Sequence, residues 1–373
     1  MDLELDDEQR ALVDSVRSVL GSSWPVASLR ACVEGGRGAD DLWSTMVALD
    51  WPALCIPEDA GGMGYGPVEA MLIHEGCGRV AAAGPFLATT ALFAPVVSAL
   101  GTHEQVRRWL PGVASGDLTA TAALGELCGP NGGPTVDATH SGSGWVLNGS
   151  ARSVIETDRV SSIAVPVATA SGTTVAVVPI EAARVEPIRS IDASRGLANV
   201  SFDAVAVDPD AILGEPGDPS TGPLLDWAVD HAVTALAAEL VGTCATILDI
   251  TLEHARQRKQ FGVKIGSFQA LKHRLADCFI ELEAARSSVR VASIALAAGD
   301  ERRAVAASSA MAMAGDAARR ITSEGIQILG GIGFTWEHDV HLFIKRALGS
   351  SVLLGSPEAH RQRVARLIGL VPV

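Results

Sequence analysis

Two short segments in the C-terminal half combine residue types that suit an anionic ligand. The segments are Arg258-Lys259-Gln260-Phe261-Gly262 and Gln327-Ile328-Leu329-Gly330-Gly331-Ile332-Gly333-Phe334. An arginine guanidinium can meet phosphate oxygens with two parallel hydrogen bonds, and paired glycines let a ligand approach the backbone closely. Each segment also has a plain structural interpretation, as a solvated charge cluster at a helix end or as a glycine that ends a helix.

The composition indicates a globular chain that can position such segments. The 373 residues are 48% hydrophobic and 19% charged, a balance that supports two or three domains with a sizeable core. The net charge of −14 argues against a nucleic-acid partner, because phosphate binding needs a basic surface. The six cysteines are scattered without a CxxC pair or a histidine at ligand spacing, so we expect no metal site.

The sequence predicts neither a membrane span nor export. No uninterrupted apolar run reaches the roughly 18 to 20 residues that cross a bilayer. The N-terminal stretch from Met1 to Glu8 is acidic, whereas a secretory signal begins basic and then turns apolar. We therefore expect a cytoplasmic protein without a membrane partner.

The hydrophobic periodicity changes twice along the chain. Residues 1–118 carry apolar side chains at helical spacing, and residues 119–220 contain short β-branched runs that predict an antiparallel β domain. In that domain Asn148-Gly149 follows an apolar run and is typical of a hairpin turn, so we expect a strand to end there. Residues 221–373 return to helical spacing, with long helices expected over 224–258, 267–297 and 301–328.

A series of further motifs resembles the acyl-CoA dehydrogenases over nearly the whole chain. In order, they are Glu8-Gln9-Arg10, Leu42-Trp43, Leu49-Asp50-Trp51, Pro57-Glu58, Gly61-Gly62, Glu75-Gly76-Cys77-Gly78-Arg79, Trp109-Leu110-Pro111, Ser115-Gly116-Asp117 and Gly144-Trp145-Val146-Leu147-Asn148-Gly149. The resemblance implies an α+β fold with an N-terminal α-helical domain (1–118), a middle antiparallel β domain (119–220) and a C-terminal four-helix bundle (221–373). It also implies FAD chemistry, in which a glutamate removes the pro-R α-proton of an acyl-CoA while a β-hydride passes to flavin N5.

The resemblance assigns a cofactor role to both opening segments. In this family the arginine that matches Arg258 contacts the pyrophosphate of an FAD that belongs mainly to the neighbouring subunit. The other residues implied for the ADP side of that FAD are Gln260, Phe261, Gln269, Gln327, Gly330 and Gly331.

Other positions depart from the family pattern. Leu354 stands where the family usually has the catalytic glutamate, and leucine cannot accept a proton. The alternative Asp-x-Glu-Arg pattern is replaced by Asp230-His231-Ala232-Val233. The flavin loop becomes 125–132 and lacks the family's serine, while Ser153-Val154-Ile155 replaces the Trp-Ile-Thr strand that packs the isoalloxazine.

The sequence therefore leaves three functions open. The first is a chemically silent subunit of a heteromeric acyl-CoA dehydrogenase, with α2β2 stoichiometry and a homologous catalytic partner that supplies the glutamate and binds most of the CoA ester. Such pairs resemble the actinobacterial dehydrogenases that act on steroid side-chain CoA esters. The second is an active homotetramer with a displaced base, for which Glu239 is a weak candidate beside Asp230, His231 and Glu358. The third is a flavin-free scaffold subunit.

Overall fold

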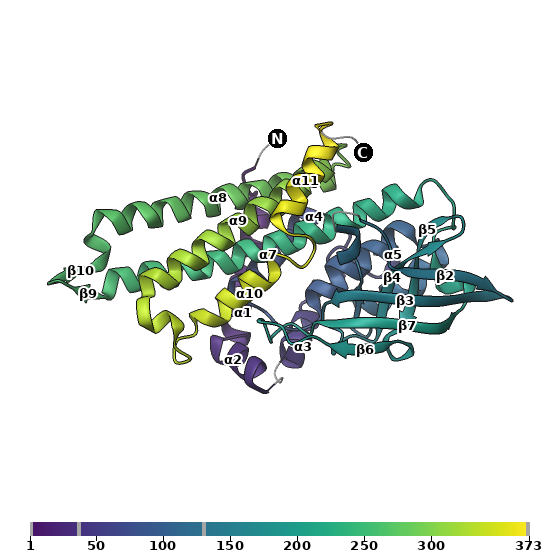
Figure 1. Ribbon diagram of the computed structural model, residues 1–373, viewed down its shortest axis with the longest axis horizontal. Coiled ribbons are helices and arrows are strands. Elements are labelled where there is room, and N and C mark those ends of the chain that lie inside the picture. The colour runs from purple at the N-terminus through teal and green to yellow at the C-terminus, as the bar shows by residue number, and fades with distance from the viewer. Residues whose placement is uncertain (1–2, 36–38, 129–131, 371–373) are drawn as a thin grey trace.

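The structure is a computed structural model that describes residues 3–35, 39–128 and 132–370. Helices form the N-terminal part of the chain, a sheet follows, and a long helical bundle extends away from the sheet (Figure 1). The division at 118/119 and 220/221 stays a prediction. The last N-terminal helix ends at Ala114, the strands run from Ala120 to Leu213, and the bundle begins at Thr221.

The N-terminal helices form where the apolar spacing predicts them. They are α1 (Asp7–Ser23), α2 (Val26–Gly35), α3 (Ala39–Ala48), α4 (Pro67–Arg79), α5 (Ala94–Leu100) and α6 (His103–Ala114). Asp6 is the N-cap residue of α1 and forms a capping box with Gln9. The Asp6 side chain accepts a hydrogen bond from the Gln9 backbone N–H, and the Gln9 side chain accepts one from the Asp6 backbone N–H. Before α5 the helical geometry is irregular, because Leu87–Phe93 is a π-helical stretch that continues into α5.

The middle of the chain forms one sheet that is mixed and not purely antiparallel as expected. Its strands are β1 (Ala120–Ala122), β2 (Val136–Ser141), β3 (Gly144–Val154), β4 (Ser162–Thr169), β5 (Gly172–Pro179), β6 (Arg184–Pro187), β7 (Ala198–Val207) and β8 (Ile212–Leu213), in the order β6-β7-β3-β2-β4-β5-β8. Both β1 and β2 pair parallel to β4, at opposite ends of that strand. The two parallel pairings join segments distant in sequence, so the local strand patterns could not predict them.

The expected turn at Asn148-Gly149 is wrong. β3 continues through both residues, and its pairing with β7 shifts register between Leu147 and Gly149, which marks a β-bulge. Gly149 has φ of 131°, and a Cβ placed there would lie 2.5 Å from the Thr135 carbonyl oxygen. The glycine therefore serves a bulge and a close backbone approach, and the hairpin turn lies earlier, where Gly142 has φ of 61°.

The C-terminal bundle is built around one long helix. Its helices are α7 (Thr221–Gln257), α8 (Gln269–Ala297), α9 (Arg303–Leu329), α10 (Val340–Ser350) and α11 (Pro357–Leu367), which matches the expected long helices to within a few residues. By length and composition α7 could cross a membrane, which differs from the expectation based on uninterrupted apolar runs. However, 83% of its most apolar window is buried inside the fold, as in the core helix of a globular protein.

Glycines bring α4 and α7 into backbone contact. A Cβ on Gly78 would lie 1.9 Å from the Glu239 carbonyl oxygen, and a Cβ on Gly242 would lie 1.9 Å from the Glu75 carbonyl oxygen. The hydroxyl of Thr243 adds a hydrogen bond of 3.0 Å to the Gly78 carbonyl. The N-terminal helices are therefore fixed directly to the central bundle helix.

Candidate functional site

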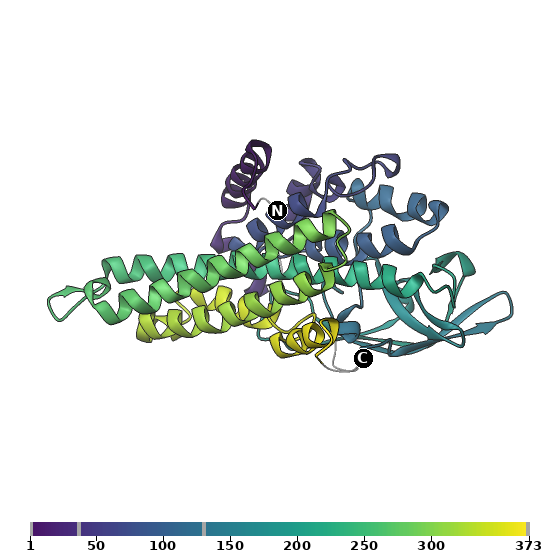
Figure 2. The ribbon, with the colours of Figure 1, turned by 90° about the horizontal axis from the view of Figure 1, so that it is seen from above.

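The two segments that suit an anionic ligand lie at the same end of the bundle, remote from the sheet (Figures 1 and 2). The first forms a hairpin of β9 (Lys259–Gln260) and β10 (Val263–Lys264), and the second follows α9 as the 3-10 turn Gly330–Phe334. Burial, then the nearby charges of Arg258 and His338, lower the pKa of His254. His254, near the end of α7, therefore lies within the electrostatic reach of residues next to both segments.

The backbone of both segments depends on positive φ angles. Phe261 and Gly262 have φ of 54° and 82° at the hairpin tip, and Gly330 has φ of 64° where α9 ends. A Cβ on Gly262, Gly330 or Gly331 would meet no atom within 4 Å. These glycines therefore leave open backbone on the outside of the molecule and do not fill an internal gap.

The side chains at this end are exposed and have few partners of their own. Arg258 is exposed, and none of the ion pairs among the described residues involves it, whereas Arg256 lies 3.8 Å from Glu253. Phe261 is 91% exposed and Phe334 is 77% exposed. The other exposed residues here that the sequence analysis assigned to the cofactor are Gln260, Gln269, Gln327 and Gly331, with Gly330 half-buried.

This surface fits the ADP side of a dinucleotide. A free guanidinium can bind a pyrophosphate, open glycine backbone can approach it, and exposed aromatic faces can stack on a base. In the described part of the chain Phe261 has an edge-on contact with the Phe268 ring, yet Phe261 and Phe334 both stay largely exposed. Exposed apolar side chains of this size mark an interaction site.

A second candidate region is the groove between the sheet and the end of α10. It has a volume of about 500 Å³ and is lined from the sheet side by Glu126, Arg152 and Ser153, and from the other side by residues 348–349, 352–353 and 355. Arg152 Nε donates to Glu126 at 2.9 Å. Of the flavin loop 125–132, residues 129–131 lie outside the described part of the chain.

This groove fits a flavin ring poorly. No aromatic side chain occurs among its described lining residues, and its two charged groups are paired with each other. Ser153, at the position of the family tryptophan, is exposed and has φ of 54°. The described part of the wall therefore provides no aromatic packing for an isoalloxazine ring, and its uncharged polar side chains are the hydroxyls of Ser153 and Ser190.

Leu354 lies beside the groove in a nearly filled apolar space. The adjoining cavity measures about 10 Å³ and is lined by Leu87, Leu92, Leu236, Leu353 and Leu354, among others, with no carboxylate among its described lining residues. Leu354 is 6% exposed, and its carbonyl oxygen lies 2.7 Å from His360 Nε2. A substrate acyl group would find neither room nor a proton acceptor there.

Glu239 points away from both spaces, into a buried ion network. Its carboxylate accepts from Arg195 and lies 3.1 Å from Arg346, which also donates to Asp192 at 2.6 Å. Burial alone would lower the pKa of Arg346, but the carboxylates of Asp192 and Glu239 outweigh it and raise that pKa above its ordinary value. Burial alone would raise the pKa of Asp192, but Arg346 and Arg195 lower it. Asp192 and Arg346 thus stabilise each other's charged forms, and the network joins the loop before β7 to α7 and α10.

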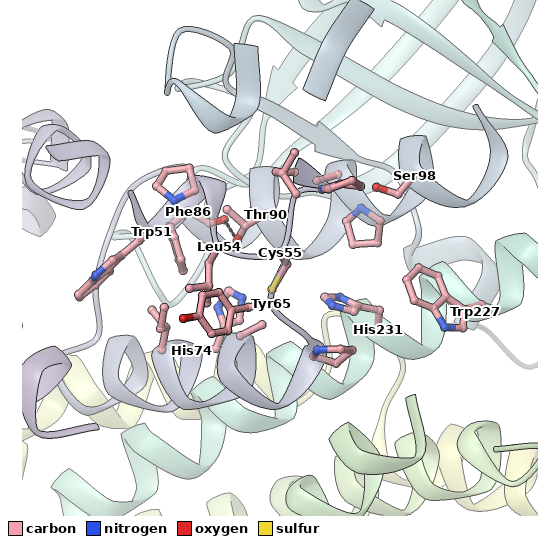
Figure 3. A pocket seen from close by; sticks show the side chains of 18 residues that line it. Trp51, Leu54, Cys55, Tyr65, His74, Phe86, Thr90, Ser98, Trp227 and His231 are labelled. Carbon is pink, nitrogen blue, oxygen red and sulfur yellow. Dashed lines mark hydrogen bonds between the residues drawn. The ribbon is translucent and has the colours of Figure 1, made fainter. Parts of the chain in front are cut away.

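The remaining candidate bases face other partners. Asp230 is fully buried, 2.7 Å from Arg363 and 3.7 Å from Arg303, and burial raises its pKa despite those arginines. His231 lines a different cavity, an apolar space between the N-terminal helices and α7 (Figure 3). Glu358 is exposed and lies 2.9 Å from Arg319. The structure thus brings the predicted cofactor residues to one end of the bundle and disperses the candidate bases.

The sequence analysis missed the network partners of Glu239. Asp192 and Arg195 lie in an irregular loop, where nothing in a single sequence distinguishes them from surface charges. Arg346 gave a weak signal, because it interrupts the apolar face of α10 and a buried arginine needs a partner.

Comparison with known proteins gives a consistent family. Residues 6–117 match the family model "Acyl-CoA dehydrogenase, N-terminal domain", and residues 223–369 match "Acyl-CoA dehydrogenase, C-terminal domain". The chain is 31% identical to acyl-CoA dehydrogenase IpdE2 of Mycobacterium tuberculosis over 96% of both chains. It is 33% identical to acyl-CoA dehydrogenase FadE34 of the same organism over 97% of this chain and 48% of that protein.

Two solved structures have closely similar folds. The first is described as the Tcur3481-Tcur3483 steroid ACAD, with a TM-score of 0.87 and 30% identity over 98% of both chains. The second is the ChsE4-ChsE5 complex from Mycobacterium tuberculosis, with a TM-score of 0.91 and 24% identity over 100% of both chains.

Proposed function

The chain belongs to the acyl-CoA dehydrogenase family, and on that premise we propose that it is a chemically silent subunit of a heteromeric acyl-CoA dehydrogenase. FAD is the cofactor of the family. In the proposed assembly this chain holds the ADP side of an FAD whose ring lies in a homologous partner subunit. The partner supplies the catalytic glutamate and binds most of the CoA ester.

The observation that carries the proposal is an asymmetry within one chain. The residues that match the family's ADP-side motifs are present, and they are exposed at the end of the bundle remote from the sheet. The space beside Leu354 is closed by leucines, and the groove next to it has no aromatic wall. Because this groove and the ADP surface lie at different ends of the molecule, the chain's own ring site and its ADP surface serve different flavins.

The roles of this chain's residues follow from their chemistry. When bound, FAD accepts a hydride from the substrate β-carbon, and the protein supplies position and electrostatics. Arg258 binds the pyrophosphate, while the backbone at Gly330 and Gly331 allows the dinucleotide to come close. Phe261 and Gln327 flank it, and Gln260 and Gln269 supply polar contacts on the adenosine side.

The proposed assembly is an α2β2 heterotetramer in the cytoplasm that acts on a steroid side-chain CoA ester. The substrate class is supported by the 30% identical structure described as a steroid ACAD. A partner subunit is supported by that structure and by the ChsE4-ChsE5 complex, both of which pair two chains in their descriptions.

The test is to purify this chain alone and together with a homologous dehydrogenase subunit from the same organism that has the catalytic glutamate. Alone, we expect a poorly soluble protein with little FAD, because Phe261, Phe334 and the exposed faces of the bundle stay uncovered. Together, we expect dehydrogenase activity and one FAD for every two chains. One FAD per chain, or a yellow active homotetramer of this chain alone, would contradict the proposal, and a flavin-free complex would favour a scaffold.

A further inference from the structure

The segment that joins α7 to α8 is strongly basic, although the chain as a whole is acidic. Residues 254–276 contain six lysines and arginines and no aspartate or glutamate, whereas the net charge of the whole chain is −14. Three of the four lysines in the chain lie in this segment, at Lys259, Lys264 and Lys272, and all three are exposed. The end of the bundle remote from the sheet therefore carries a local excess of positive charge (Figure 1).

Most of these cations have no counter-charge among the described residues. Arg256 lies 3.8 Å from Glu253, and Arg274 pairs with Glu324. Arg258 and the three lysines take part in none of the ion pairs that the described part of the chain forms. Their charges are therefore available to an anion that approaches from solvent.

The lysines occupy positions that the local structure disfavours. Lys264 is the direct partner of Lys259 in the antiparallel pairing of β9 and β10. The Cβ atoms of such a pair are roughly 4.5 to 5.5 Å apart, and like charges there destabilise the pairing. Lys272 lies near the start of α8, where the helix dipole disfavours a cation and the first turn has no acidic residue. The stability of the fold does not account for these placements, whereas a nearby anion would relieve the repulsion.

The hairpin and the start of α8 are close enough to act on the same anion. The ring centroids of Phe261, at the hairpin tip, and Phe268, the N-cap of α8, are 6.3 Å apart. At 0.1 M ionic strength the Debye length is about 10 Å, so exposed charges farther away are largely screened. The acidic remainder of the chain therefore does not cancel the attraction that an anion meets at this end.

The pyrophosphate of FAD is the anion that the proposed function places here. It carries fewer negative charges than this surface has unpaired cations. The guanidinium of Arg258 suits direct contact, because its planar fork can meet two phosphate oxygens. A lysine ammonium is a strongly hydrated point charge on a flexible stem, so it can act on the approaching cofactor through its field.

On the premise of the proposed function, we propose that Lys259, Lys264 and Lys272 form a capture surface that determines how fast FAD binds to the composite site. Arg258 instead determines how long FAD stays bound. Charges at the rim of an interface mainly change the association rate, whereas a desolvated charge pair mainly changes the dissociation rate. Electrostatic steering raises association rates by roughly 10 to 10³-fold.

The experiment is stopped-flow binding of FAD to the flavin-depleted complex of this chain with its partner. The triple variant Lys259→Gln, Lys264→Gln and Lys272→Gln should bind FAD about tenfold more slowly at about 0.01 M ionic strength, where screening is weak. At about 1 M ionic strength the difference should fall below about twofold, because the Debye length is then about 3 Å. The release rate of FAD, measured by displacement, should stay near wild type at both ionic strengths.

The matched control removes the same charge elsewhere. The triple variant Arg107→Gln, Arg108→Gln and Arg184→Gln changes exposed residues of α6 and β6, outside the basic segment, and should bind FAD at the wild-type rate. Thermal unfolding provides an independent readout. The lysine variant should be at least as stable as wild type, because it loses the like-charge pair across the hairpin.

The proposal is overturned if the lysine variant binds FAD at the wild-type rate at low ionic strength, or if the control variant slows binding as much. It is also overturned if the lysine variant mainly speeds release, because the lysines would then be direct ligands of FAD. Arg258→Ala separates this outcome from a failure of the proposed function. If the composite site exists, Arg258→Ala speeds FAD release even where the lysines have no effect, whereas a site without this chain is unaffected by either change.

Discussion

At the scale of single residues, the deciding comparison is between Leu354 and Glu239. Sequence reasoning found Leu354 at the base position from the neighbouring motif, and the structure shows a leucine-lined space of about 10 Å³ around it. Glu239 had to remain open as a displaced base, because periodicity alone did not give its partners. Those partners, Arg195 and Arg346, come from a loop and from α10, and only tertiary folding brings them to α7.

We predict that Glu239→Gln weakens the fold without slowing the chemistry. Removing one member of a buried ion pair leaves Arg346 and Arg195 undercompensated, at a cost of roughly 3 kcal/mol. Chemical denaturation of the complex should show that loss, while the exchange rate of the substrate α-proton, measured per folded complex, should stay near wild type. A general base contributes roughly 10² to 10⁴-fold to the rate of proton transfer. A rate loss of that size would therefore support the alternative in which this chain is itself active and Glu239 is its base.

Glu253→Gln is the matched control on the same helix. Glu253 is exposed and only 3.8 Å from an exposed Arg256, so both stability and rate should be unchanged.

At the scale of elements, the spacing of apolar residues predicted the helices better than residue types predicted the strands and turns. The apolar period placed α7, α8 and α9 to within a few residues, because each helix buries a continuous face of its own sequence. Asn148-Gly149 was misread because the same dipeptide suits a turn or a bulge, and the choice is made by the pairing with β7. The contact of α4 with α7 through Gly78 and Gly242 was not predictable, since sequence does not show which backbones approach closely.

Because of that contact, we predict that adding one methyl group lowers the stability at one glycine of α7 and not at another. Gly242→Ala should push α4 from α7, because the new Cβ would overlap the Glu75 carbonyl, and overpacking of this kind costs about 1 to 3 kcal/mol. Gly222→Ala, in the first turn of the same helix, meets nothing within 4 Å and should be neutral or slightly stabilising. Thermal unfolding of the two variants makes the comparison, and equal melting temperatures would show that the helices are not in contact there.

At the scale of the whole molecule, the account depends on a separation of two surfaces. Arg258, Phe261 and Gly331 are exposed in segments at the end of the bundle where β9 and β10 lie, remote from the sheet (Figures 1 and 2). The closed space at Leu354 is instead lined in part by residues 122–125 and 152–155 of the sheet region. The sequence motifs alone suggested that the chain retains the ADP side of a flavin site, because Arg258 and Gln327 lie in segments that match the family. The sequence could not show that these ADP-side residues are exposed and have few side-chain partners, because exposure is a property of the fold.

The most direct measurement is an FAD titration of the reconstituted complex in which only this chain carries Arg258→Ala. We predict that FAD binds at least roughly 2 kcal/mol more weakly, or about thirtyfold in Kd, because the pyrophosphate loses its guanidinium within an interface. Arg256→Ala, two residues earlier and paired with Glu253, should leave the Kd unchanged. Equal FAD affinity of the wild-type and Arg258→Ala complexes would mean that this chain does not reach the cofactor, and would contradict the composite site.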